Sequence, residues 1–487
     1  MDCFSKLPPE LRIRIFSKFS STATIFRLMQ ASPAMFSQYK VSKTTIRRHY
    51  VANLLTGDRH EDLLQDALGL LYLGPSDNRP DNHVMKYIIR QWNSKALPNP
   101  FEEKDQDTIA KLYKLFSSIS MFVEDYISKA TSSNPPQAYL CLPQITNPNR
   151  GLYYKEHSFS PRHITLDDLM SSERHFLLWA FIKYEMFSKV QGPKAVSLME
   201  DNEYMAISKR AIDELTDCED EAIKCVLEYV DAVYGALYTV STRCSTRHAS
   251  SALPDKPASP IRLFYPDNLY FSPFKAWEDM DLPSTCLPVM VGYACNFPEI
   301  GFDLLRNTVL FANKTQPEDM RSWFYTIHSP YTRLQYPISR HYLLPLLNRM
   351  RTDYLYHQDD SPRSFLMRRL SHTHASLSYI QVKIFRQRAW VFLDDTRVFR
   401  MGLSHFPTIE ELDNQGNTAF GTEAMLEEKE RQRLRLLQLC QYRRESGIEE
   451  TQREGREYLF SANGEDSIPR FFDPPGNRGV TTFWEYF

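Results

Sequence analysis

Glycine is scarce in this sequence. The chain has 16 glycines and 30 prolines among 487 residues, whereas average usage would give roughly 34 glycines and about 24 prolines. Dinucleotide-binding folds and long β-architectures depend on glycine-rich turns, so the composition disfavours both. Proline, in contrast, is well tolerated in the first turn of a helix and between helices. We therefore expect a mainly α-helical protein with long proline-rich loops.

Long apolar runs and paired cysteines are missing as well. No run approaches the ~20 apolar residues that a membrane-spanning helix needs, and charged residues interrupt the apolar positions between Met1 and Phe19, unlike a signal-peptide core. The eight cysteines form no C-x-x-C pair and show no regular spacing, which is typical of reduced thiols. These absences predict a protein of the cytoplasm, the nucleus or both, with no membrane partner.

Signatures of common catalytic and cofactor sites are also absent. The sequence has no glycine-rich phosphate loop and no G-x-S-x-G elbow, and no second histidine follows the His60-Glu61 pair at the spacing of a zinc protease. His372 and His374 are two residues apart, so on a helix they would point to different faces. We interpret them as ordinary surface or core histidines, and we expect no catalytic residue, no cofactor and no metal.

Charge is balanced overall but uneven along the chain. The net charge is −2, which gives no global field for nucleic acid. Residues 1–50 carry nine basic and two acidic side chains, a net +7, and the rest carries 49 basic and 58 acidic ones, a net −9. Twelve basic residues lie between residues 331 and 400, but at irregular spacing, which favours solvated helix faces over an RNA site. We expect no nucleic-acid partner.

The first fifty residues contain three short helical patterns. A proline-rich start precedes the first, a Ser20-Ser21 break precedes the second, and Ser32-Pro33 supplies an N-cap and an N1 proline for the third. The apolar positions of the three patterns are Leu11, Ile15, Phe16 and Phe19, then Ile25, Leu28 and Met29, then Phe36 and Tyr39. A module of this size buries little apolar surface. Its remaining apolar residues therefore need to be covered either by the downstream domain or by a partner protein.

Further helices are predicted behind this module. Apolar residues at i, i+3 and i+4 predict a core helix over residues 105–130, with Lys111, Lys114 and Asp125 on its opposite face. Thr165 to Asp168 has the pattern of a capping box that opens a strongly apolar helix. Residues 131–164 look like a loop, residues 245–288 like an ordered, aromatic-rich loop facing a partner, and residues 389–395 like a short strand or a buried turn. The other expected helices span residues 60–73, 81–95, 220–242, 298–312, 317–328, 337–351, 362–388 and 423–445.

Two groups of residues carry a resemblance to a known family. The run Leu7-Pro8-Pro9-Glu10-Leu11, followed by Ile15-Phe16-Ser17-Lys18-Phe19, resembles the opening of an F-box. The segment from Ile25 to Pro33 looks like the second half of the variant found in filamentous-fungal F-box proteins, and the run from Trp390 to Leu403 resembles a segment near their C-terminal ends. Many F-boxes have a tryptophan in the third helix, where this chain has Met35 and Phe36.

The resemblance implies a function and a domain order. It implies that residues 1–52 form an F-box that docks onto a Skp-family adaptor, which bridges to a cullin, a RING subunit and a charged conjugating enzyme. Residues 60–446 would then form a helical domain that binds an unknown protein target, and residues 447–487 a partly disordered tail. The chain would be a non-catalytic substrate receptor of an SCF-type ubiquitin ligase. The positions expected to contact the adaptor are Leu7, Pro8, Leu11, Ile15, Phe16, Leu28 and Pro33.

Two alternatives to this interpretation stay open at this point. One is a helical enzyme whose site is assembled only in the fold, which would require a pocket with several convergent titratable groups. The other is an F-box protein that binds the adaptor but acts outside the ligase.

Overall fold

The computed structural model describes residues 2–58, 61–74, 81–132, 138–139, 141–143, 152–154, 157–159, 163–191, 202–241, 301–312, 320 and 379–393. Within these ranges the protein is mainly α-helical, as the scarcity of glycine predicted. None of the helices in these ranges is both long enough and apolar enough to cross a membrane.

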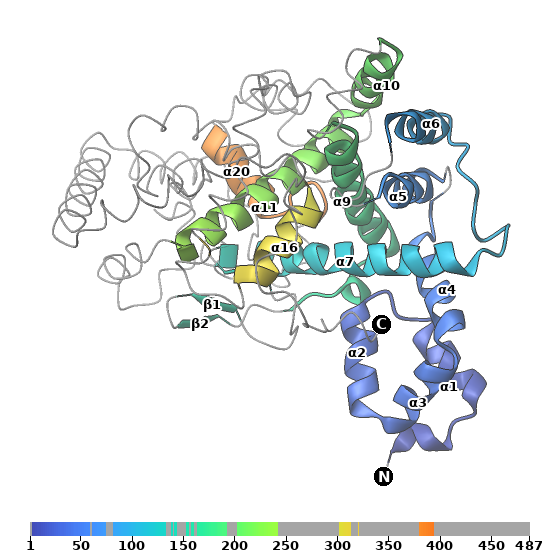
Figure 1. Ribbon diagram of the computed structural model, residues 1–487. Helices are drawn as coiled ribbons and strands as arrows, with labels where there is room; N and C mark the ends of the chain where they lie inside the picture. The colour runs from blue at the N-terminus through green and yellow to red at the C-terminus, as the bar shows by residue number, and fades with distance from the viewer. Residues whose placement is uncertain are drawn as a thin grey trace, which may run out of the picture.

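The N-terminal residues form a lobe that lies below the rest of the molecule in Figure 1. This lobe, residues 2–42, contains the 3-10 helix η1 (Cys3–Lys6) and the helices α1 (Pro9–Phe16), α2 (Thr22–Ala31) and α3 (Pro33–Val41). The three predicted helices are confirmed, and so are two of their caps: the Ser21 and Ser32 side chains accept from the N–H groups of Thr24 and Met35. Serine at these positions satisfies N–H groups that a helix start leaves unpaired.

A fourth helix, α4 (Lys43–Leu54), connects the lobe to the body and was not predicted. Its buried residues Ile46, Tyr50 and Leu54 recur every fourth position, so the signal for an amphipathic helix was present in the sequence. The buried face packs against α7 (Gln106–Ala130), which runs across the body in Figure 1.

The body consists of helices that pack around α7 and α9 (Ser171–Gln191). The expected helices near residues 60–73, 81–95, 220–242 and 298–312 are confirmed, with ends shifted by a few residues. The remaining elements are α5 (Asp62–Leu73), α6 (Asn82–Asn93), η2 (Leu166–Asp168), α10 (Asn202–Asp213), α11 (Asp217–Ser241), α16 (Phe302–Ala312) and α20 (Tyr379–Gln387). Residues 131–164, expected to be a loop, contain an antiparallel hairpin of β1 (Leu152–Tyr154) and β2 (His157–Phe159), with Leu152 opposite Phe159.

Helix α7 is the central element of this arrangement. The predicted apolar stripe from Ile109 to Tyr126 is buried along its length. Near the C-terminal end of α7, the Phe122 ring lies 4.8 Å from Phe302 of α16, and the Tyr126 ring lies 5.4 Å from Tyr229 of α11. Such offset and edge-to-face ring contacts add to the free energy gained from burial. A single helix thus supports elements that are far apart in the sequence.

Asp125, on the face of α7 opposite the predicted apolar stripe, is largely buried, with a side chain that is 10% exposed. Its Oδ2 atom accepts a hydrogen bond of 2.8 Å from the Tyr229 hydroxyl and lies 2.7 Å from Lys129 Nζ, whose side chain is fully buried. The apolar periodicity in the sequence of a helix reveals only one buried face. Here α11 covers this part of α7 from a second side.

The capping box at Thr165 is confirmed, but it opens a different element from the one expected. Asp168 Oδ2 accepts from the Thr165 N–H at 2.8 Å, and the box closes the single 3-10 turn η2. The chain then extends at Leu169, and α9 begins at Ser171 with a second cap, in which Glu173 accepts from the Met170 N–H. The apolar run that follows, including Phe176 and Phe181, is buried as predicted.

The segment after α20 is a buried turn, which settles the choice left open for residues 389–393. Trp390 has no exposed surface, and its Nε1 donates to Glu221 Oε1 at 3.1 Å. Arg386 donates from Nε and Nη2 to the two oxygens of the same carboxylate at 2.7 and 2.8 Å. The bidentate pair is almost completely buried and joins α20 to the start of α11.

Several predictions concern residues that lie outside the described ranges. These are the aromatic-rich loop over residues 245–288, the helices over 317–328 apart from Met320, over 337–351, over 362–378 and over 423–445, the histidines His372 and His374, and the tail over 447–487.

The buried pair between Glu221 and Arg386 should be far more important for stability than an exposed one. Arg386→Ala leaves the Glu221 carboxylate buried without its cation, so we expect a loss of about 3–5 kcal/mol in the free energy of unfolding. Arg90→Ala is the matched control, because the Arg90–Glu203 bridge is about half exposed on both sides and a surface bridge contributes about 1 kcal/mol or less. Urea unfolding of the full chain, monitored by circular dichroism, measures the free energy of unfolding of both variants. Equal losses in the two variants would contradict the prediction.

Candidate functional site on the N-terminal lobe

Asp2 holds the start of the lobe together. Its Oδ2 atom accepts from Ser32 Oγ at 2.7 Å and from the Ala34 N–H at 3.1 Å, while Oδ1 accepts from the Phe4 N–H at 3.0 Å. The hydrogen bond from Ser32, followed by that from Ala34, lowers the pKa of the Asp2 carboxyl below its usual value. The carboxylate therefore ties η1 to the N-terminal end of α3.

The interior of the lobe is formed by apolar residues from all three helices. Phe16 has no exposed surface, and its ring packs edge-on against Tyr39 with 5.8 Å between ring centroids. Ile25 and Met35 are buried beside them in the same core. Phe16 was expected to contact an adaptor directly, but in this structure its side chain lies inside and shapes the lobe surface from beneath.

The other predicted contact positions reach the lobe surface to different degrees. Leu11 is 44% exposed. Pro8 and Pro33 are exposed, whereas Leu7, Ile15 and Leu28 are half-buried. Leu11 and Ile15 are one helical turn apart on α1, so they lie on the same side of that helix. The structure thus leaves six of the seven predicted positions at least partly accessible.

Two further apolar residues on α3 belong to this surface. At the place where many F-boxes have tryptophan, Met35 is buried and Phe36 is 44% exposed, with Lys40 Nζ 4.3 Å from the centre of its ring. Val41, at the end of the same helix, is 85% exposed. The sequence pattern identified Phe36 as apolar but missed Val41. An exposed apolar residue at a helix end gives no periodic signal.

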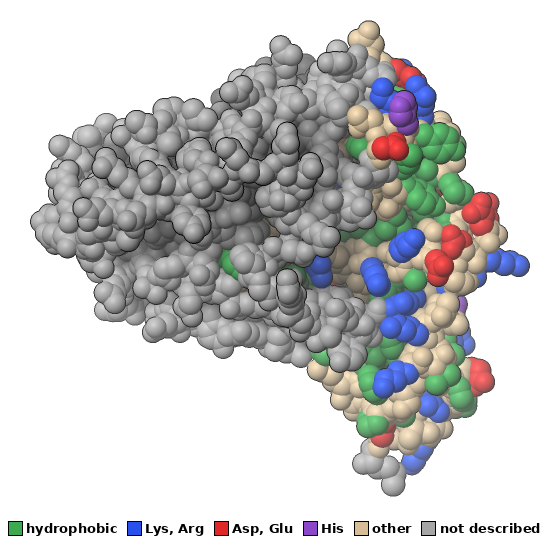
Figure 2. Space-filling model, viewed as in Figure 1, with side chains coloured by type: hydrophobic (Ala, Val, Ile, Leu, Met, Phe, Trp, Pro, Cys, Tyr) green, Lys and Arg blue, Asp and Glu red, His purple; other side chains and the backbone are tan. Residues whose placement is uncertain are grey.

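Basic side chains are frequent on the surface of the lobe. Figure 2 shows Lys and Arg side chains over the lobe, next to hydrophobic ones and with few acidic ones between them. Glu10 lies in the first turn of α1, where the helix dipole favours a negative charge, and Asp2 is engaged as described above. The exposed basic residues of the lobe are Lys6, Arg14, Lys18, Arg27 and Lys40.

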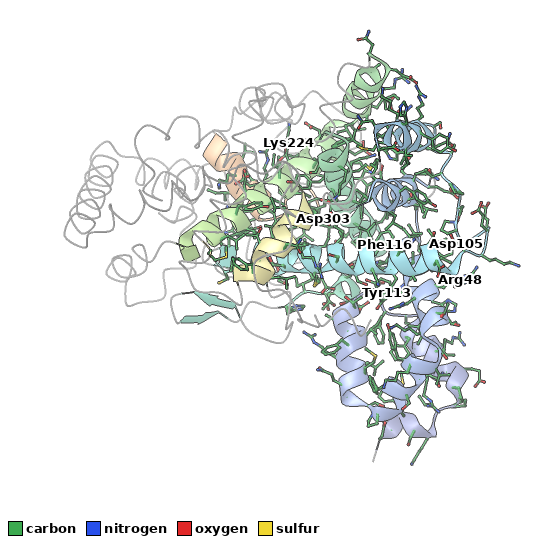
Figure 3. All side chains as sticks on the ribbon, viewed as in Figure 1. Arg48, Asp105, Tyr113, Phe116, Lys224 and Asp303 are labelled. Atoms are coloured by element: carbon green, nitrogen blue, oxygen red, sulfur yellow. The ribbon has the colours of Figure 1, made fainter. Side chains whose placement is uncertain are left out.

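The lobe and the body share a continuous core. The Tyr50 ring of α4 packs edge-on against Tyr113 of α7 with 5.1 Å between centroids, and the Tyr39 and Tyr113 hydroxyls are 3.4 Å apart. Figure 3 shows Tyr113 on the side of α7 that faces the lobe. Burial raises the pKa values of Tyr50 and Tyr113 well above the ordinary value, so both stay protonated. The lobe is therefore attached to α7 by packed aromatic side chains rather than by a linker alone.

Within the described residues, no three or more His, Cys, Asp or Glu side chains are grouped as a metal site requires.

Comparison with family models, with curated proteins and with solved structures finds no match for this chain.

Interior and surface positions of the lobe should respond differently to truncation. Phe16→Ala leaves a cavity under α1 and α3 and should cost about 3–5 kcal/mol of unfolding free energy. Leu11→Ala removes a half-exposed side chain from the same helix and should change it by about 0.5 kcal/mol or less. Urea unfolding of both full-length variants tests the assignment, which fails if Leu11→Ala is as costly as Phe16→Ala.

Proposed function

We propose that this protein is a non-catalytic substrate receptor of an SCF-type cullin-RING ubiquitin ligase. The observation that carries the proposal is the N-terminal lobe: it extends from the body and keeps Leu11, Phe36 and Val41 exposed among basic side chains. Exposed apolar residues on a small lobe that also carries many basic side chains favour a protein partner. The F-box resemblance, carried by the segment that includes Leu11, suggests that this partner is a Skp-family adaptor.

The adaptor contact is assigned to the surface of α1, α2 and α3. The positions from the resemblance that remain accessible are Leu7, Pro8, Leu11, Ile15, Leu28 and Pro33, and Phe36 joins them. Phe16 and Met35 support this surface from the interior. The surplus of basic side chains favours an acidic adaptor face and a faster association, because opposite charges steer the encounter. Through the adaptor, the chain would reach the cullin, the RING subunit and the conjugating enzyme.

The body behind the lobe is the part assigned to target binding. Among its described residues, Val84 and Tyr87 on α6 and Met170 before α9 are large apolar side chains with exposed surface. Helix α6 lies on the side of α7 away from the lobe in Figure 1, so a target bound at Val84 and Tyr87 would not compete with the adaptor for one surface.

Co-purification with a Skp-type adaptor tests the proposal. In the double variant Leu11→Asp with Phe36→Asp, two exposed apolar contacts become carboxylates that the interface would have to desolvate. We expect recovery of adaptor to fall by at least about tenfold, equivalent to about 1.4 kcal/mol of binding free energy. Both side chains are substantially exposed, so the lobe should still fold, and circular dichroism checks this.

The matched control is Val84→Asp with Tyr87→Asp on α6, since Val84 is as exposed as Leu11, at 44%. This control should bind the adaptor like the wild type. Adaptor binding of the wild type should also weaken with increasing salt, because the lobe charges are screened. Failure of the wild type to bind any Skp-type adaptor would refute the proposal, and adaptor without cullin in the purified material would refute its ligase part.

A further inference from the structure

The N-terminal turn of α2 is inserted into the body at a buried acidic site. Ser20 and Ser21, which precede α2, have no exposed surface. The Ser20 N–H donates to Asp167 Oδ1 of η2 at 2.5 Å, and Asn53 Nδ2 of α4 donates to Ser20 Oγ at 2.8 Å. The lobe thus presents N–H groups at a helix start, where the helix dipole favours negative charge, to a carboxylate from a residue almost 150 positions away.

A second carboxyl group lies at the same junction. Glu124 of α7 is buried, and its Oε1 atom accepts from the Leu166 N–H at 3.1 Å, directly beside Asp167 in the chain. Burial raises the pKa of Glu124 to about 7, and the charge of Asp167 adds to the rise, whereas hydrogen bonds from Ser21 and Leu166 oppose it. Burial also raises the pKa of Asp167. Ionising both carboxyl groups in one desolvated region costs free energy.

The surrounding groups come from every element packed at this junction. Arg27 of α2 lowers the pKa of Glu124, and Arg174 of α9 lowers that of Asp167. Tyr50 of α4 stays protonated, as its raised pKa requires. Burial, with Arg27, lowers the pKa of His163, and Asp168 of η2 opposes that shift.

We propose that Glu124 and Asp167 form a proton-controlled latch that fixes the N-terminal lobe on the body. The closed junction is most stable when one of the two carboxyl groups is protonated, because only a single negative charge then faces the N-terminal turn of α2. Opening the junction hydrates both carboxyl groups and removes their mutual repulsion. The inference goes beyond adaptor binding and does not depend on it.

The direction of the pH dependence follows from the raised carboxyl pKa. A proton is held more tightly in the closed junction than in the open one, so closure is most stable below about pH 4.5 and weakens as the pH rises to about 7. The opening constant should therefore increase over this window, by at most about 300-fold for Glu124 alone, and level off above it. His163 would act in the opposite direction, because the lowered pKa of a base makes opening easier as the pH falls.

Hydrogen–deuterium exchange of the full chain between pH 5 and 8 tests the latch. After correction for the intrinsic exchange rate, amides in a peptide over residues 17–31 should exchange at least about tenfold faster at pH 7.5 than at pH 5. A body peptide over residues 176–187 should not follow. Glu124→Gln, which keeps an oxygen for the Leu166 N–H, should remove most of the increase, whereas the exposed control Glu102→Gln should retain it.

Several results would overturn the latch. One is exchange at residues 17–31 that does not change with pH in the wild type, and another is an unchanged pH profile in Glu124→Gln. If amide exchange in the body peptide increased in parallel, the pH effect would come from global unfolding and not from the junction. If circular dichroism shows that Glu124→Gln does not fold, Asp167→Asn takes its place: it removes the charge that adds to the raised pKa of Glu124 and must reduce the increase, and an increase as large as in the wild type would overturn the latch. No adaptor is present, so the result is independent of the proposed function.

Discussion

The burial of α7 on more than one side is the constraint on which the rest of the structure depends. Near its start, Tyr113 packs against α4 and thereby positions the lobe. Near its end, Phe122 and Tyr126 pack against α16 and α11. A helix is stiff over its 25 residues, so the two ends cannot adjust independently. The lobe is consequently held in a defined orientation relative to the body.

The apolar residues of the lobe fall into a buried set and an exposed set, and this division determines the chemistry of the lobe surface. Phe16 and Met35 fill the small interior of the lobe. Leu11, Phe36 and Val41 stay exposed because three short helices cannot enclose every apolar side chain. The body covers part of this excess through α4 and α7. Leu11, Phe36 and Val41 remain exposed on a lobe rich in basic side chains, and this combination is the basis of the proposed protein partner.

Much of the fold could be predicted because its signals are local. Caps at Ser21 and Ser32 and the i, i+4 stripe of α7 depend on residues within a few positions of one another. The same reasoning named the candidate surface, but it could not separate Phe16 from Leu11, since both are apolar positions of one short helix. Which of them is buried depends on where α3 packs. The burial of Asp125 could not be foreseen for the same reason, because α11 covers a face of α7 whose sequence is polar.

By itself, the sequence determined the helical class and the approximate positions of most described helices, because propensity, capping and periodicity act over short distances. Only the tertiary structure decided which charges are buried. Arg386 meets Glu221 across 165 positions, and Asp167 meets Ser20 across 147. No local pattern encodes such a pairing, since burial depends on every element that packs around the group, and the desolvation it causes sets both the stability and the proton affinity of the site.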